Sequence, residues 1–413
     1  MNTHSAVSSM HKSTLALTAA ACLPALLAVL AVSIFSGVLA LGLGIVFGFG
    51  ALLLSALAWA GHLVEERQKR IETGQPDLFL TRNAGRSEAA VRDGQVPEWS
   101  GLRRWLARHG FGHRLMVGDS VRVKSFDAIR ATLDADGCLE GLPFMDEMVA
   151  LCGQPLRVYR VVDKIYDYGR SRLMRRLDNC VLLLGQRCDG GAHASCEAAC
   201  YLIWKAAWLE APGDLPATTA PAVRTVRALA PASPGEALSC QYTQLTQASQ
   251  EVAAADGRGL FGPLVAGNVT AAAFIVAVAT RAFNALQGRR GGATYPSKPL
   301  PSDDKTIRGE SLAAGDWVRV KTPADIARAM DKNSKNRGLW FDADMLKHCG
   351  QAYQVRGRVE KIIDVGSGKI IPMKTPCIVL EDVHYSGEFQ GFGEQHDFLY
   401  WREAWLTRIA PPT

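Results

Sequence analysis

One stretch of this chain occurs twice, and the repeat limits the folds that the chain can adopt. Residues 118–209 align without a gap with residues 315–406, at a constant offset of 197, and about 30 of the 92 aligned pairs are identical. Two copies are too few for a solenoid, which usually needs at least three stacked units. The sequence therefore predicts two related globular domains, which we call repeat 1 (118–209) and repeat 2 (315–406).

Each repeat has the pattern of a small α+β domain. A strand with period-2 alternation is expected at 120–124 and again at 317–321. A helix follows, and in repeat 2 its start is marked by Thr322 as a cap and Pro323 in the first turn. A second short helix and further strands, at 156–164 and 180–184 in repeat 1, complete the unit. We expect an SH3-like curled sheet in each repeat.

The N-terminal part has the composition of a membrane segment. Residues 13–62 contain no Lys, Arg, Asp or Glu. A helix needs about 20 apolar residues to cross a bilayer, so the run has room for two helices, over 15–32 and 38–60. A cleaved signal peptide explains the run less well, because its apolar region is only about 7 to 15 residues long. We expect a transmembrane helical hairpin within residues 1–63.

Basic residues flank this run and predict its orientation. Lys12 precedes the run, and Arg67, Lys69 and Arg70 follow it, so the positive-inside tendency places both ends in the cytoplasm. The lipid bilayer is then one partner, and the protein is expected in the inner membrane of a bacterium with both repeats facing the cytoplasm. The basic juxtamembrane segment, 64–117, either contacts anionic headgroups or forms a solvated helix.

A linker is expected between the repeats, over residues 210–314. Five prolines fall among Ala and Thr in 211–234, a composition typical of an extended linker, so we expect tethered repeats without a common core. The apolar stretch 264–280 is short for a membrane span and contains Asn268. We expect a buried or interfacial helix over 260–286. If this stretch instead crossed a bilayer, the repeats would face opposite compartments.

A cysteine and histidine cluster in repeat 1 is the main candidate site. Cys188, His193, Cys196 and Cys200 fall within thirteen residues. Three thiols and an imidazole are a ligand set of structural zinc sites, and the glycines of the loop give it freedom to fold around an ion. The spacing is not that of a standard zinc finger.

Two other interpretations of the cluster stay open. Cys188-Asp189-Gly190, followed by His193, resembles the core of CDGSH iron–sulfur proteins, although the histidine is one residue too far away and the upstream Cys-x-Cys pair is missing. The cysteines can also be small buried apolar residues or disulfide partners. Repeat 2 cannot form the same site, because its aligned residues are Tyr385, Gln390, Gly393 and Asp397.

Repeat 1 also resembles a small cysteine-rich bacterial domain of unknown function. The similarity rests on a Gly-Leu-Pro-Phe-Met motif, a Cys-Gly pair, the cysteine cluster and a terminal pair of tryptophans. It implies no activity. The matching residues are 141–145, 152–153, 188–200 and 204–208.

Other polar and sulfur-containing residues give weaker signals. Cysteines shared by both repeats are expected in the cores, whereas Cys138 and Cys240 give no signal. A polar group in repeat 2 is interpreted as a surface loop, with an oxygen and nitrogen metal site as the alternative. Recurrent Lys–Asp pairs are interpreted as turns. The shared cysteines are Cys152, Cys180, Cys349 and Cys377. The polar group of repeat 2 is His384, Glu388, Glu394, His396 and Asp397. The Lys–Asp pairs are Lys164 with Asp167 and Lys361 with Asp364.

Composition and motifs exclude several classes of function. The net charge of +6 is mild, and the chain has neither a zinc-finger spacing nor a dense basic tract, so nucleic acid is not an expected partner. No P-loop, nucleophile elbow or zinc-protease motif is present, which argues against an ordinary hydrolase or NTPase. We expect a membrane-anchored, non-enzymatic binding or scaffold protein with a zinc site and an unknown protein or small-molecule partner. The alternative is a thiol or iron–sulfur redox protein that uses the same cluster.

Overall fold

The structure of the protein is a computed structural model, and it describes the greater part of the chain. Most of the expected transmembrane hairpin and the proline-rich part of the linker lie outside the described residues. The described residues are 55, 58–75, 87–95, 100–108, 114–167, 170–171, 173–210, 238–252, 258–296, 308–387 and 393–412.

Repeat 1 folds into an antiparallel sheet. Its strand order is β6-β5-β4-β1-β7, and β8 (Gln250–Glu251) pairs with β5 as well. Residues 238–252, which the sequence places in the linker, thus belong to repeat 1. The strands of the main path are β1 (Ser120–Val123), β4 (Pro155–Tyr166), β5 (Met174–Arg187), β6 (Tyr201–Lys205) and β7 (Leu209–Glu210).

Repeat 2 has the same topology, in the order β14-β13-β12-β9-β15. The pairing register is also the same, because Ser120 opposite Arg157 in repeat 1 corresponds to Trp317 opposite Gln354 in repeat 2. Both long hairpins have register shifts at equivalent places, where β-bulges bend the sheet. The strands are β9 (Trp317–Val320), β12 (Ala352–Ile363), β13 (Ile370–His384), β14 (Phe398–Trp401) and β15 (Leu406–Ile409).

The expected fold class, α+β behind an N-terminal hairpin, is wrong: the described protein is mostly sheet. β5 begins at Met174, six residues before the expected strand; the sequence does not indicate this start, because buried Arg175 interrupts the apolar alternation. Its guanidinium donates to Oγ and the carbonyl of Ser249 at 2.8 and 2.7 Å. The helices inside the repeats are short, with four to six residues in α6 (Phe126–Arg130), α7 (Asp146–Val149), α11 (Pro323–Arg328) and the 3₁₀ helix η2 (Ala343–His348). Two-residue hairpins precede α7 and η2: β2 (Cys138–Leu139) with β3 (Leu142–Pro143), and β10 (Lys335–Asn336) with β11 (Leu339–Trp340).

Each repeat encloses its own aromatic core. Phe144 packs edge-on against Trp208 with ring centroids 5.2 Å apart, and Phe341 packs against Trp405 in the same way, at 5.2 Å. The tryptophans are fully buried. Such edge-to-face pairs stabilise a core by about 0.5–1.5 kcal/mol beyond the area that they bury. The 197-residue offset therefore extends from the strands to the packing of side chains.

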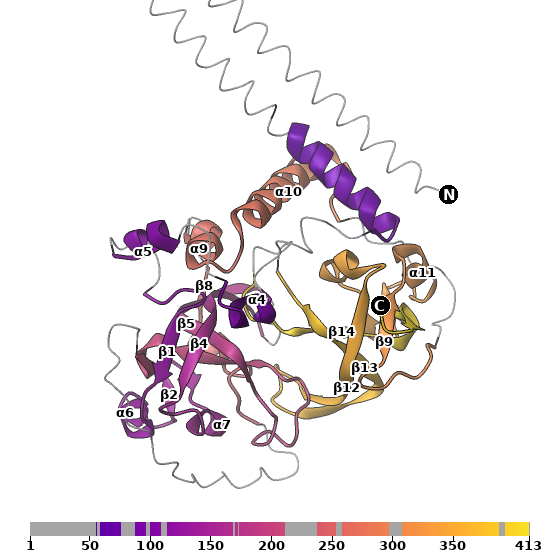
Figure 1. The fold of residues 1–413 in the computed structure, drawn as a ribbon. Helices are drawn as coiled ribbons and strands as arrows, with labels where there is room; N and C mark the ends of the chain where they lie inside the picture. Colours follow the sequence, from indigo (N-terminus) through magenta and orange to yellow (C-terminus); the bar gives the residue numbers. More distant parts are fainter. Residues whose placement is uncertain are drawn as a thin grey trace, which may run out of the picture.

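The longer helices lie at one end of the molecule, above both sheets in Figure 1. The expected helix over 260–286 is two helices, α9 (Arg258–Ala266) and α10 (Ala271–Arg290), because Thr270 caps α10 and accepts a hydrogen bond from Ala273 N. Asn268, at the elbow, donates to and accepts from the backbone of Val161 on β4. Among the described helices, only α10 is long and apolar enough to cross a membrane by composition, and 33% of its apolar window is buried. Three further helices are a helix over 58–72, α4 (Glu88–Arg92) and α5 (Ser100–Arg108).

The two repeats contact each other through the same residues of each copy. The backbone N–H of Glu394 donates to the carbonyl of Lys164 at 3.0 Å, and the N–H of Glu197 donates to the carbonyl of Lys361 at 3.0 Å. Both glutamates and both lysines are 197 residues apart. This reciprocity is the property of a two-fold, isologous interface, realised here within one chain.

The glutamate side chains repeat the same pattern. Glu394 Oε2 accepts from Asp163 N (2.6 Å) and Lys164 N (3.0 Å) at the bulge of β4. Glu197 Oε2 accepts from Glu360 N (2.5 Å) and Lys361 N (3.3 Å) at the bulge of β12. Each repeat thus accepts hydrogen bonds from backbone N–H groups at the bulge of the other repeat. We call this pair of contacts the reciprocal glutamate clasp.

The pseudo-two-fold axis passes between residues that are themselves equivalent. Arg187 Nη2 lies 2.9 Å from Nε2 of His384, and these residues are 197 apart. The Arg187 guanidinium also lies over the rings of Tyr201 and Phe398, another equivalent pair, at 3.8 and 4.2 Å. Although the repeats keep separate cores, they meet along a specific and polar interface.

Candidate metal site and the cavity between the repeats

The cysteine loop of repeat 1 is a tight turn closed at its base. The N–H of Cys188 donates to the carbonyl of Cys200 at 2.8 Å. Gly190 has φ of +73°, and a Cβ there would lie 2.1 Å from the carbonyl oxygen of Cys196. Only glycine fits this position, so the loop has one close-packed conformation.

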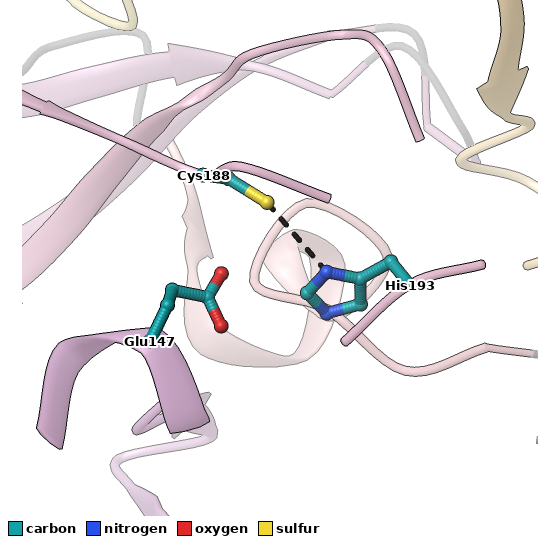
Figure 2. Close-up of side chains that lie close together, drawn as sticks. All are labelled: Glu147, Cys188 and His193. Carbon is teal, nitrogen blue, oxygen red and sulfur yellow. Dashed lines mark hydrogen bonds between the residues drawn. The ribbon is translucent and has the colours of Figure 1, made fainter. Parts of the chain in front are cut away.

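Within this loop, Cys188 and His193 face each other and meet a carboxylate from another element. Cys188 Sγ lies 3.6 Å from His193 Nδ1. Glu147, on α7, points toward both, as Figure 2 shows. One ligand atom of each of the three residues lies within 4.8 Å of the other two. We call Glu147, Cys188 and His193 the Glu–Cys–His group.

The group contains polar atoms that are buried and unsatisfied. Within the described residues, neither carboxylate oxygen of Glu147 nor Nε2 of His193 has a hydrogen-bond partner. Buried polar atoms without partners cost about 1–3 kcal/mol each, so such atoms in a native site call for a ligand. The N–H of Gly190 donates to Cys188 Sγ at 3.4 Å, which favours a thiolate. Without an ion, burial and the nearby Glu147 raise the pKa of Cys188.

Two of the four residues predicted as ligands lie outside this group. Cys196 Sγ accepts a hydrogen bond from the N–H of Ile363 in repeat 2, at 3.3 Å. Cys200 is not one of the three grouped residues either; burial raises its pKa, and Asp397, Cys240, Cys196 and Cys188 act in the same direction. The structure brings Cys188 and His193 together and separates Cys196 and Cys200 from them, although all four line one cavity.

Two residues of the site carried no sequence signal. Glu147 lies 41 residues before Cys188, next to the Gly-Leu-Pro-Phe-Met motif, and no spacing rule connects the two. Cys240 comes from the segment after repeat 1, yet it lines the same cavity. Gln241 holds this segment in place, because its side chain accepts from Ile203 N (2.8 Å) and donates to Ile203 O (2.8 Å).

A cavity of about 900 Å³ separates the group from repeat 2. Its wall is mainly apolar and aromatic, with side chains from both repeats, and its size is within the range typical of small-molecule sites. The hydroxyl of Tyr385 lines it, buried and without a hydrogen-bond partner among the described residues. Asp397 also lines it and accepts from Tyr242 Oη at 2.8 Å, and burial raises the pKa of Asp397 to about 6.

The polar group of repeat 2 is an interface. His384 and His396 stack with ring centroids 4.2 Å apart, and Nδ1 of His396 lies 3.0 Å from the hydroxyl of Tyr159 in repeat 1. Glu394 belongs to the clasp, and Glu388 lies outside the described residues. The solvated surface loop that the sequence favours is not what these buried side chains form.

The remaining candidates have structural roles. Although burial acts to raise it, hydrogen bonds from Ser171, Thr246 and Arg170 hold the pKa of Asp167 below its usual value. Asp364 accepts from N and Oγ of Ser367, so it also closes a turn. The shared cysteines are packed in or against the cores, and burial raises the pKa of each: Cys152, Cys180, Cys349 and Cys377.

Comparison with known proteins gives no relative. No family model, no curated protein and no solved structure matches this chain.

Proposed function

We propose that this protein binds a small molecule in the cavity between the repeats, and that a zinc ion held by the Glu–Cys–His group forms part of that site. The observation that carries the proposal is the convergence of Glu147, Cys188 and His193, with buried unpartnered atoms, on the wall of the cavity. The proposal keeps the zinc and the binding role expected from the sequence and changes the ligand set.

The donor types suit zinc. Thiolate, imidazole and carboxylate are its usual protein ligands, and three protein ligands leave the fourth tetrahedral position open. A closed structural site would have four protein ligands. When bound, zinc would supply a Lewis-acidic position that accepts a donor atom of the ligand. The protein's own residues supply an apolar wall, and the Tyr385 hydroxyl and the Asp397 carboxylate supply hydrogen-bonding groups.

The redox alternative has less support. An iron–sulfur cluster is usually held by four thiolates, whereas this group offers one. A redox-active thiol needs a lowered pKa, but burial raises the pKa values of Cys188, Cys200 and Cys240.

Cobalt substitution of the full chain tests both parts of the proposal. One equivalent of Co²⁺ should give a tetrahedral visible spectrum with a thiolate charge-transfer band. Cys188→Ser should weaken binding by more than about 100-fold, since even the loss of a residue that only supports a ligand costs 10–100-fold. Cys138→Ser is the control, because Cys138 is not part of the group.

An apolar probe with a nitrogen donor, 4-phenylimidazole, then tests the cavity. It should change the cobalt spectrum of the wild-type protein and bind more weakly when Tyr385→Phe removes the unpartnered hydroxyl. Equal metal binding by the Cys188→Ser and Cys138→Ser variants would refute the metal site. A cobalt spectrum that no such probe changes would refute the open position and leave a structural site.

A further inference from the structure

Exposed apolar side chains gather on the helices at one end of the molecule. Eight large apolar side chains are exposed in the described part of the chain, and five of them lie on the helix over 58–72, α5, α9 and α10. Single exposed apolar residues are ordinary, but a group on one end marks an interaction surface. The five are Trp59, Leu102, Trp105, Phe261 and Ile275, each 50–54% exposed.

Specific contacts hold these helices in place. Phe261 of α9 packs on Phe274 of α10, with ring centroids 5.5 Å apart. Arg67 of the helix over 58–72 donates to Thr280 Oγ1 of α10 at 3.3 Å. Arg104 of α5 forms an ion pair with buried Asp119 at 2.6 Å. The helix over 58–72 and α9 are thus joined to α10, and α5 is joined to repeat 1; Figure 1 shows all four helices at one end of the molecule.

Three of the four helices contain charged residues of one sign only. α5, α9 and α10 together contain seven arginines and no Asp or Glu, while the helix over 58–72 carries both signs. Arg281, Arg289 and Arg290 of α10 are exposed. Over α5, α9 and α10, apolar and aromatic side chains with arginines and no carboxylates complement a surface that is anionic outside and apolar beneath. The uncharged run 13–62 also ends in the helix over 58–72.

We propose that this helical end lies on the surface of an anionic lipid bilayer. Tryptophans favour the level of the headgroups, apolar side chains enter the boundary of the acyl chains, and arginines bind phosphates. Each basic residue near an anionic surface contributes about 1 kcal/mol, or about fivefold in affinity. This inference is independent of the proposed metal and ligand site, which faces the space between the sheets.

A position-specific reporter in the full chain tests the surface. An environment-sensitive fluorescent amino acid replaces Ile275, and in a control protein it replaces Ile371, which is exposed on β13. With vesicles of phosphatidylcholine and phosphatidylserine, the probe at 275 should shift to the blue and be quenched by brominated lipids. The probe at 371 should not respond. A reporter is needed because the uncharged run can hold the chain at a vesicle by itself.

A charge comparison completes the test. Arg281→Gln, Arg289→Gln and Arg290→Gln together should weaken the response at 275 on the order of 100-fold. Removing three exposed lysines of repeat 2 by Lys332→Gln, Lys369→Gln and Lys374→Gln should leave it unchanged. No response at 275, equal responses at 275 and 371, or equal effects of the two triple variants would overturn the proposal.

Discussion

The loops 188–200 and 385–397 occupy equivalent places in the two repeats, and they share some contacts and differ in others. Gly190 and Gly387 both have positive φ, and a Cβ at either would lie 2.1 Å from backbone of the facing residue, Cys196 or Gly393. Both loops contain a glutamate of the clasp, Glu197 or Glu394. The first carries thiols and an imidazole toward the cavity, whereas the second carries Tyr385 and Asp397.

The comparison separates the loop residues that both repeats need for their fold and their contact from the loop residues that differ between the repeats. The glycine and the glutamate recur because both repeats need the same tight turn and the same contact with the partner's bulge. Other residues of the two loops line the cavity, and there repeat 1 and repeat 2 contribute different chemistry: Cys188, His193, Cys196 and Cys200 against Tyr385 and Asp397. The clasp itself is asymmetric in its burial, because Glu394 is 1% exposed while Glu197 is exposed.

Removal of the clasp glutamates should therefore have unequal effects. Glu394→Ala leaves Asp163 N, Lys164 N and the amide of Asn268 without their shared acceptor. Unsatisfied buried donors cost about 1–3 kcal/mol each, so we expect a loss of about 3 kcal/mol or more in the free energy of unfolding, measured with urea.

Glu197→Ala is the matched control for that variant. Its partners, Glu360 N and Lys361 N, are close to solvent, so the loss should stay below about 1 kcal/mol. Equal losses for the two variants would contradict the asymmetry of the clasp.

The two glycines give a second matched pair. Gly190→Ala and Gly387→Ala each introduce a Cβ into a left-handed turn that has no room for it, so each should reduce the free energy of unfolding by about 1–3 kcal/mol. Only Gly190→Ala should also weaken cobalt binding, because only that loop holds Cys188 and His193. Weakened metal binding in Gly387→Ala would mean that the loops are not separable in function.

The repeat and its strands could be predicted from the sequence, and the class of fold could not. Alternation at 120–124 and the conserved offset correspond to β1 and to the shared register of the sheets. A cap such as Thr322 marks the start of a helix but not its length, and α11 ends after six residues, so the capping signal alone does not reveal a fold that is mostly sheet. The sequence does not indicate the strand start at Met174, because a charged residue such as Arg175 is expected in solvent. Arg175 is buried instead, since its guanidinium donates hydrogen bonds to Ser249.

The candidate site was half predictable for a physical reason. Cys188 and His193 are near each other in the sequence, so a local motif can indicate them. Glu147 and Cys240 line the cavity only because of tertiary packing. Cys196 instead accepts a hydrogen bond from the backbone N–H of Ile363 in the other repeat. The identity of Glu197 and Glu394 is visible in the alignment, but their reciprocal contact is not.

The pH dependence of stability should reveal the buried member of the clasp. Burial and then Asp163 raise the pKa of Glu394 to about 7, from the ordinary value of 4.5. Its contribution to stability is complete below pH 4.5 and is lost as the pH rises through about 7. The difference in unfolding free energy between wild type and Glu394→Gln should therefore change over this window, and a constant difference would contradict the raised pKa of Glu394.

The smallest of these effects on stability is expected at acid pH, from the stacked pair His384 and His396. Burial, and then Arg160 and His384, lower the pKa of His396 below the ordinary 6.5. The stability that neutral His396 contributes is present above pH 6.5 and is lost as the pH falls. His396→Asn keeps an acceptor for Tyr159 and should reduce the loss of stability in acid. Tyr159→Phe removes the same hydrogen bond and should leave the acid loss in place.

Anomalous scattering at the zinc edge, from crystals of the full chain grown with zinc, tests the central claim most directly. The account predicts a peak bonded to Glu147, Cys188 and His193, with Zn–S near 2.3 Å and Zn–N near 2.0–2.1 Å, and an open position toward the cavity. No peak in the loop 188–200, or a peak bonded to Cys196, Cys200 and Cys240 instead, would contradict it.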